Sequence, residues 1–177
     1  SPAIADMVAK AAQAAGLAVT DCGDVPTPAL ALAAMEAGAA AVMVTGSHIP
    51  SDRNGLKFYT PAGEITKAHE AAILAALDGK TDTVTGPGVV QNINAGAAYI
   101  ARFVTAYGSA LTGLRIGVYS HSAVGRDLLL YLFAQLGAEV VELGRSLDFI
   151  PVDTEAVDPT IRTQLKSWAA EHSLDAI

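Results

Sequence analysis

The stretch AAAVMVTGSHIPSDRNGLKFY, residues 39–59, joins an apolar run to a polar loop and then to a second run of strand-forming residues. The near-continuous apolar run at 39–44 predicts a strand covered on both faces, as in a parallel α/β sheet. Asn54-Gly55 is a two-residue turn signal, so LKFY at 56–59 is expected to return as the second strand of a hairpin. The loop therefore carries a serine and a histidine on one side of the turn and a lysine on the other.

Helical and extended patterns alternate along the rest of the chain. Helices are expected at 2–15, 28–37, 64–80, 95–111, 123–137 and 159–173. Further strands are expected at 17–23, 114–120, 138–144 and from residue 174 onward. This alternation indicates βαβ units, so the fold class is α/β, with two similar units whose mainly parallel sheets are flanked by helices. The polar, glycine-bearing stretch 81–92 is typical of a linker, and we place the two domains at 1–92 and 93–177.

Composition excludes several classes of protein. The net charge is −7 and the 11 Lys and Arg residues are scattered, which disfavours a nucleic-acid partner. No apolar run approaches the roughly 20 residues of a membrane span. The single cysteine, Cys22, allows no intrachain disulfide and suits the reducing cytoplasm. The chain begins without Met in a helical pattern and ends as a strand begins, so we expect a fragment of a longer protein.

Common catalytic and binding motifs fit poorly. Ile49 takes the place of the second Gly in G-x-S-x-G, which makes a serine hydrolase a weak interpretation. Residues 117–127 match neither nucleotide-binding fingerprint, and the four histidines show no metal-ligand spacing. Within that segment, the side chains at 120–122 and Arg126 can contact a phosphate or a neighbouring loop, and a plain polar turn is the simpler interpretation.

The residues of the 44–59 loop allow two interpretations. Gly46 permits close approach of the backbone to a ligand. If the turn brings Lys57 back towards Ser47, then a hydroxyl, the imidazole of His48 and an ammonium group share one loop, as phosphoryl transfer requires. A solvated hairpin with no chemical role fits the same residues about equally well.

The segment TGSHIPSDRNGLKFY resembles the active-site loop of the α-D-phosphohexomutases, the family of phosphomannomutase and phosphoglucomutase. That family's pattern is close to T-[AG]-S-H-N-P-x-x-x-N-G-x-K. The residues that match at the right spacing are Thr45, Gly46, Ser47, His48, Pro50, Asn54, Gly55 and Lys57. The segments DCGDVPTPAL and GLRIGVYSHSAVGRD resemble further parts of the same family. The resemblance implies that 1–92 and 93–177 are phosphohexomutase domains 1 and 2.

The resemblance also implies roles for these residues. Ser47 is expected to carry the phosphoryl group and, through that phosphate, to bind Mg²⁺. Lys57 is expected to act as general acid/base, and His48 to assist positioning or proton transfer. Thr45, Gly46, Asn54 and Gly55 are expected to support the loop. The implied substrate is a small phosphosugar, mannose or glucose phosphate. Its phosphate would move between C6 and C1 through a hexose 1,6-bisphosphate, which also serves as activator.

Two departures from the family pattern keep alternatives open. Ile49 replaces the usual Asn, and the turn at 120–126 lacks the common glycine-rich, Asp-containing sequence. The alternatives are a phosphoglucosamine mutase and a non-catalytic phosphosugar-binding homologue. The family's magnesium loop, D-G-D-x-D-R, normally follows a strand like LDAI at 174–177. The remaining metal ligands are therefore expected beyond residue 177, and the fragment alone is expected to be inactive.

Overall fold

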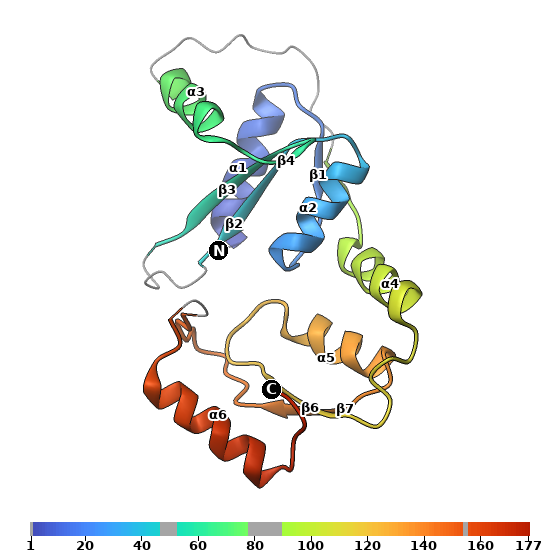
Figure 1. Cartoon of the computed structure of the whole chain (residues 1–177). Coiled ribbons are helices and arrows are strands. Elements are labelled where there is room, and N and C mark those ends of the chain that lie inside the picture. The colour runs from blue at the N-terminus through green and yellow to red at the C-terminus, as the bar shows by residue number, and fades with distance from the viewer. Residues whose placement is uncertain (1, 47–52, 78–89, 154–155) are drawn as a thin grey trace. The chain divides into compact units, whose positions relative to one another are not determined.

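The computed structural model describes residues 2–46, 53–77, 90–153 and 156–177 (Figure 1). The chain divides into two compact units. Unit 1 consists of Ser1–Gly23, Thr27–Gly46 and Asn54–Ala95, and the main segment of unit 2 is Gly96–Ile177. In the described parts of the chain, no helix is both long enough and apolar enough to cross a membrane.

Unit 1 combines a parallel strand pair with an antiparallel sheet. Strand β1 pairs with β5 in parallel, and β2, β3 and β4 form an antiparallel sheet in that order. Its elements are α1 (Pro2–Ala14), β1 (Val19–Asp21), α2 (Thr27–Glu36), β2 (Ala41–Thr45), β3 (Gly55–Thr60), β4 (Gly63–Glu64), α3 (Lys67–Leu77) and β5 (Val90–Asn92). Helix α2 packs on β2 and β3, and Ala29 and Ala34 on this helix are buried.

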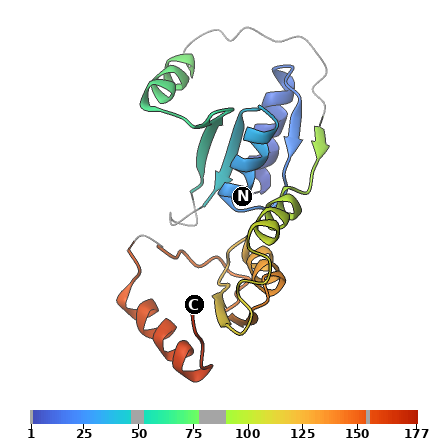
Figure 2. The same ribbon diagram turned by 45° about the vertical axis from the view of Figure 1, so that its right-hand side comes forward.

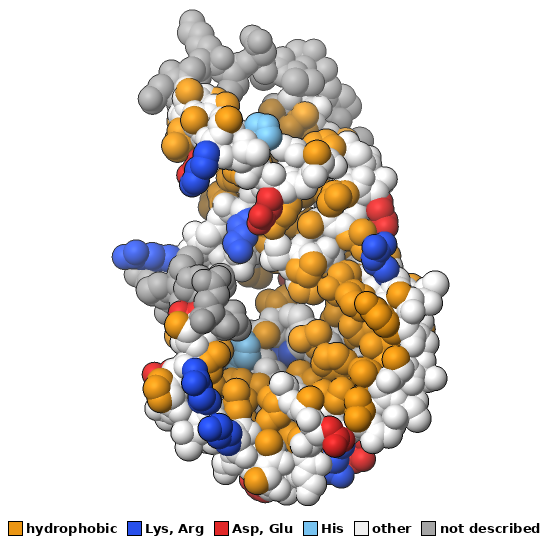
Figure 3. Space-filling model, viewed as in Figure 1, with side chains coloured by type: hydrophobic (Ala, Val, Ile, Leu, Met, Phe, Trp, Pro, Cys, Tyr) orange, Lys and Arg blue, Asp and Glu red, His pale blue; other side chains and the backbone are white. Residues whose placement is uncertain are grey.

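Helix α3 is amphipathic only weakly, and its surface is largely exposed. Leu74 and Leu77 are 58% and 75% exposed. Figure 3 shows hydrophobic side chains on the surface over this helix, next to residues drawn in grey. The helix is tied locally by an ion pair between Lys67 and Glu70, a surface contact that contributes little to stability.

The expected hairpin is present, but its turn differs from the prediction. Thr45 pairs with Gly55, so the loop spans residues 46–54 and Gly55 already belongs to β3. The prediction of a two-residue turn at Asn54-Gly55 was wrong. The observed register pairs Val44 with Leu56, apolar with apolar. A turn centred on 54–55 would pair Leu56 with Arg53 instead, and register follows the apolar face.

A second correction concerns the stretch 81–92, which was expected to be loop. Its last three residues, Val90–Asn92, form β5 beside β1. A strand this short, made partly of Gln and Asn, shows no periodic pattern. It exists because β1 offers a free edge to pair with.

Unit 2 is a parallel sheet between two helices. Its elements are α4 (Ala95–Tyr107), β6 (Arg115–Tyr119), α5 (Arg126–Gln135), β7 (Glu139–Leu143) and α6 (Pro159–Glu171). Strand β6 pairs with β7 on one edge and with Ala176 on the other, both in parallel. Where a strand was expected from residue 174 onward, the structure shows a single parallel bridge, between Ala176 and Ile116. The connection through α5 runs from β6 to β7, and the connection through α6 runs back past β6 to Ala176 on its other side. Because the two connections run in opposite directions and crossovers are right-handed, α5 and α6 lie on opposite faces, as Figures 1 and 2 show.

The core of unit 2 lies around β6. Ile116 and Val118 on this strand are buried, together with Leu132, Leu136 and Leu143. On the opposite side, Trp168 of α6 packs against Tyr119, with ring centroids 5.4 Å apart. The α/β fold class with parallel sheets and flanking helices is thus confirmed, and the antiparallel β2–β3–β4 sheet is an addition to it.

Gly144, which follows β7, lies under the aromatic pair that anchors α6. A Cβ at Gly144 would lie 2.8 Å from a ring atom of Tyr119 and 2.9 Å from one of Trp168. Its φ is +56°, while Gly108 has nearly the same φ, +55°, and open space around it. The two glycines therefore differ in sterics and share the same backbone strain.

This pair gives a matched test of α6 packing. Gly144→Ala is expected to lower the free energy of unfolding by about 1–3 kcal/mol more than Gly108→Ala, because only the first forces the rings apart. In both variants, an alanine in the left-handed backbone conformation costs about 1–2 kcal/mol, and this cost cancels when the two variants are compared. Urea denaturation followed by Trp168 fluorescence measures the difference, and equal destabilisation would contradict the packing argument.

Candidate active site

The base of the 46–54 loop is fixed by the last pair of the β2–β3 ladder. Thr45 and Gly55 form this pair, and Gly46 and Asn54 are the first and last residues of the loop. All four are partly buried. A Cβ at Gly55 would lie 3.5 Å from the carbonyl oxygen of Thr45, an ordinary contact. The described geometry therefore does not require Gly at position 55.

Ser47 and His48 lie outside the described residues, and the roles predicted for them stay predictions. Lys57 is described, and it lies opposite Met43 in the ladder. Because side chains alternate along a strand, Lys57 shares a face with Gly55 and Tyr59. It is two residues, or about 7 Å along the strand, from the loop base.

The Lys57 side chain lies at an exposed position on β3. The residue is exposed, whereas Tyr59 on the same face is 7% exposed. In the described parts of the chain, Lys57 takes part in no ion pair or hydrogen bond of its side chain. Strand β3 thus carries the exposed Lys57 near the loop base and the buried Tyr59 two residues further along.

Tyr59 fixes β3 at the end away from the loop. The Tyr59 hydroxyl is hydrogen-bonded to Glu64 of β4, and burial, followed by the nearby Glu64 charge, raises the pKa of Tyr59. Beyond it, the Thr60 hydroxyl donates to the Gly63 carbonyl at 3.1 Å and accepts from the Ala62 amide at 3.2 Å. These contacts hold the β3–β4 turn, so Lys57 lies on a strand that is tied at both ends.

A second polar cluster lies at the carboxyl end of the unit 2 sheet. Ser120 is fully buried and its hydroxyl donates to Glu142 at 2.7 Å. Arg145 donates to the same carboxylate at 2.5 Å and also forms an ion pair with Asp127. The hydrogen bond from Arg145 is the main cause of a lowered pKa at Asp127. The cluster therefore links the ends of β6 and β7 to the first turn of α5.

The neighbouring side chains join two loops. Arg126 Nη1 donates to the carbonyls of His121 and Ser146, at 3.0 and 2.8 Å, and the Ser146 amide donates to the His121 carbonyl at 2.8 Å. The Ser122 hydroxyl accepts from the Ile150 amide at 2.8 Å and donates to the Ile150 carbonyl at 3.3 Å. We call this set of five residues the loop clamp. Of the two contacts considered for residues 120–126, the structure shows the one to a neighbouring loop.

The sequence did not identify Glu142, Arg145, Ser146 and Ile150 as partners of this turn. The available signal was indirect. In a parallel sheet, the carboxyl ends of neighbouring strands meet at one edge. Two strands predicted at 114–120 and 138–144, each followed by polar residues, were therefore candidates for such contacts.

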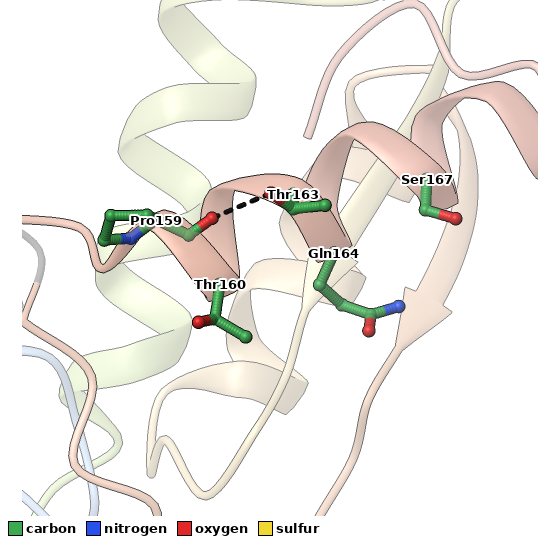
Figure 4. Close-up of a pocket in the computed structure, with 5 residues that line it drawn as sticks. All are labelled: Pro159, Thr160, Thr163, Gln164 and Ser167. Carbon is green, nitrogen blue, oxygen red and sulfur yellow. Dashed lines mark hydrogen bonds between the residues drawn. The ribbon is translucent and has the colours of Figure 1, made fainter.

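The described residues hold no cluster of three His, Cys, Asp or Glu side chains that could bind a metal ion. A hollow of about 490 Å³ lies along α6 and is lined by Pro159, Thr160, Thr163, Gln164 and Ser167 (Figure 4). Asp158 caps this helix end by accepting from the Thr160 amide at 2.7 Å. Since a carboxylate already occupies the positive end of the helix, an anionic ligand is disfavoured there.

The buried Ser120–Glu142 contact can be tested by itself. Ser120→Ala is expected to lower the free energy of unfolding by about 1–2 kcal/mol, because it removes a buried hydrogen bond to a charged acceptor. Ser167→Ala on the exposed face of α6 serves as control and should change stability by less than about 0.5 kcal/mol. Chemical denaturation measures both, and equal values would show that the contact contributes nothing.

Comparison with known proteins finds similarity to a family model and to several named relatives. Residues 1–83 match the family model described as "Phosphoglucomutase/phosphomannomutase, alpha/beta/alpha domain I". The whole chain aligns with proteins named phosphomannomutase, at 47% identity in Sinorhizobium fredii and 45% in Salmonella muenchen. A phosphoglucosamine mutase of Rhodococcus erythropolis is 31% identical over 91% of the chain.

A solved structure agrees. A phosphoglucomutase/phosphomannomutase family protein from Burkholderia thailandensis superposes with a TM-score of 0.70 at 31% identity, covering 80% of this chain and 32% of its own. The chain spans 39% and 37% of the length of the two phosphomannomutases. The similarity thus covers this chain in full and its relatives in part.

Proposed function

Because the chain belongs to the phosphoglucomutase/phosphomannomutase family, we propose that it is part of an enzyme that moves phosphate between C6 and C1 of a hexose phosphate. The observation that carries the proposal is the hairpin. Strand β2 ends and strand β3 begins on the two sides of the segment that matches the family's serine loop. The exposed Lys57 lies on β3 near the base of that loop. Residues 1–92 and 93–177 are proposed to be domains 1 and 2 of that enzyme, acting in the cytoplasm.

The proposed reaction begins with a phosphoryl group on Ser47. The bond from phosphorus to the serine oxygen breaks, and a bond to the free hydroxyl of the sugar forms, giving a hexose 1,6-bisphosphate. That hydroxyl loses its proton as it attacks, and Lys57 is proposed to take the proton, with His48 assisting, while the departing oxygen of Ser47 takes up a proton and becomes a hydroxyl again. After the sugar turns around, the Ser47 hydroxyl loses that proton as it attacks the sugar's other phosphate, and Lys57 gives its proton to the departing sugar oxygen.

The charges of the described site fit these roles. A phosphoserine carries about −1.5 to −2 charges at neutral pH and needs cationic groups nearby. Lys57 offers a compact point charge on a flexible stem, and lysine pKa values shift readily on burial. A lysine on a tied strand can therefore be held at a fixed place beside the loop while its proton affinity responds to bound substrate.

Mg²⁺ is proposed to bind through the phosphate on Ser47. The described residues hold no cluster of three His, Cys, Asp or Glu side chains that could bind the ion, and the remaining ligands are proposed to lie beyond residue 177. When bound, the metal ion would neutralise charge on the transferring phosphoryl group. A hexose 1,6-bisphosphate is the proposed activator.

Two other assignments remain candidates. The phosphoglucosamine mutase relative supports an amino sugar as substrate, but the higher identity to phosphomannomutases favours mannose phosphate. Ile49 in place of Asn favours a non-catalytic phosphosugar-binding homologue, because an apolar side chain supplies no amide hydrogen bonds. A small phosphosugar is the partner in each case.

The position of the phosphate tests the central role of Ser47. Peptide mass spectrometry of the full-length protein is expected to find phosphate on Ser47. In the Ser47→Ala variant, the peptide that contains position 47 is expected to carry no phosphate. Ser51→Ala, in the same loop, should keep the modification. A phosphate found consistently on another residue would overturn the assignment.

The proton-transfer role of Lys57 is tested by Lys57→Met in the full-length protein. Turnover is expected to fall by about 10²–10⁴-fold, the usual contribution of general acid–base catalysis. Lys67→Met is the matched control, because Lys67 is 95% exposed on α3 and should retain full turnover. Thermal unfolding checks that both variants fold, and near-normal turnover of Lys57→Met would count against the role.

A further inference from the structure

The segment that follows β7 depends on the loop clamp for its position. Leu147 is 93% exposed and Phe149 45% exposed, so neither side chain anchors the segment in the core. Its attachments are polar: the carbonyl and amide of Ser146, and both backbone groups of Ile150. The segment lies at the carboxyl edge of the unit 2 sheet, where parallel α/β sheets bind their ligands.

His121 is the strained member of the clamp. Its φ is +29°, in the left-handed region that a non-glycine residue rarely adopts. Its Nδ1 is buried and has no hydrogen-bond partner within the described residues. The ring lies 5.1 Å from that of Tyr119 in an edge-to-face contact. Burial of this nitrogen without a partner disfavours the charged form of the imidazole.

His121 contributes its backbone carbonyl to the loop clamp, so a movement of its side chain can affect the clamp. The His121 carbonyl accepts from both Arg126 and the Ser146 amide. If the imidazole turns out to water, the packing on Tyr119 that opposes the strained φ is lost. A return to an ordinary negative φ then swings this carbonyl away from both donors, since φ and ψ set its direction.

We propose that His121 is an acid-sensitive latch, in which protonation of the imidazole releases residues 146–150 from the turn between β6 and α5. This inference stands apart from the proposed mutase reaction, because it uses no residue of the serine loop. Its consequence is a carboxyl edge of the unit 2 sheet that is covered at neutral pH and open in acid.

The charges around His121 favour this behaviour. From α5, Arg126 faces it with a positive charge; from β6, Tyr119 contacts it; and from α6, Trp168 packs behind Tyr119 without charge. At the end of β7, Glu142 is bound to Ser120 and Arg145, and Arg145 is also paired with Asp127. The carboxylates of Glu142 and Asp127 are therefore already paired. Within the described residues no hydrogen bond or ion pair joins a carboxylate, that of Asp148 included, to the imidazole.

The direction of the pH effect follows from these surroundings. Burial, and next the charge of Arg126, lower the pKa of His121 from its usual value of about 6.5. The released imidazole regains that usual value and binds a proton more tightly. Release is therefore favoured as the pH falls below about 6.5, by at most about tenfold per pH unit for one proton, and levels off below the lowered pKa.

Hydrogen exchange and histidine titration by NMR test the latch on the 177-residue chain. The protection factors of the Ser146 and Ile150 amides are expected to fall up to about tenfold per unit between about pH 6.5 and 5. The Gly117 amide, bonded to Ala176 in the sheet at 2.8 Å, should keep its protection. The fall should coincide with the titration of the His121 ring.

Two variants separate the latch from general loosening. His121→Asn tolerates the left-handed backbone and cannot titrate in this range, so its protection factors should be flat with pH. Ser122→Ala should lower Ile150 protection at every pH and leave the slope at Ser146 intact. The proposal is overturned if wild-type protection is flat, if His121 titrates at or above its usual pKa, or if His121→Asn keeps the slope. Should His121→Asn fail to fold, the coincidence of the two wild-type titrations decides.

Discussion

The register of the β2–β3 ladder is the constraint on which the candidate active site depends. It is fixed by apolar pairs on one face, Val42 with Phe58 and Val44 with Leu56. A slip by one residue would turn every side chain to the opposite face. Lys57 would then leave the face it shares with Tyr59, and the loop would begin and end at different residues. The apolar pairs of the ladder thus decide which face of β3 carries Lys57.

The same logic holds in unit 2, where the central place of β6 organises the sheet. Strand β6 pairs with β7 on one side and, through Ile116, with Ala176 on the other, and the carboxyl ends of β6 and β7 lie side by side. The polar residues after β6 and β7 are adjacent for that reason alone. Ser120 and Glu142, 22 residues apart in sequence, meet there as a buried hydrogen bond.

Much of this architecture was predictable from local patterns. Pro2 and Pro159 each begin a helix, as expected of proline in the first turn, and Gly16 has the positive φ of a helix end. Strand β5 was not predictable, because pairing with a distant strand creates it. The turn at Asn54-Gly55 was misplaced because a local dipeptide signal gave way to the register of apolar pairs.

The candidate site divides along the same line. The sequence motif singled out Lys57 and the residues that flank the loop, because spacing within one hairpin is local information, and the roles assigned to them stay predictions. It gave no partners for Ser120 or Arg126, because those depend on which strands become neighbours. The left-handed φ of His121 was equally hidden, since no local sequence signal marks it.

The two polar turns of the molecule use their cations in opposite ways. In unit 2, Arg126 donates to two carbonyls and Arg145 is shared by two carboxylates, so their charges stabilise the fold itself. In unit 1, the Lys57 side chain is exposed, and within the described residues no carboxylate neutralises it. A transferring phosphoryl group needs positive charge that is not already committed. This contrast favours the hairpin loop of unit 1 as the place of the proposed phosphoryl transfer, whereas the arginines of the unit 2 turn already hold the loops around it.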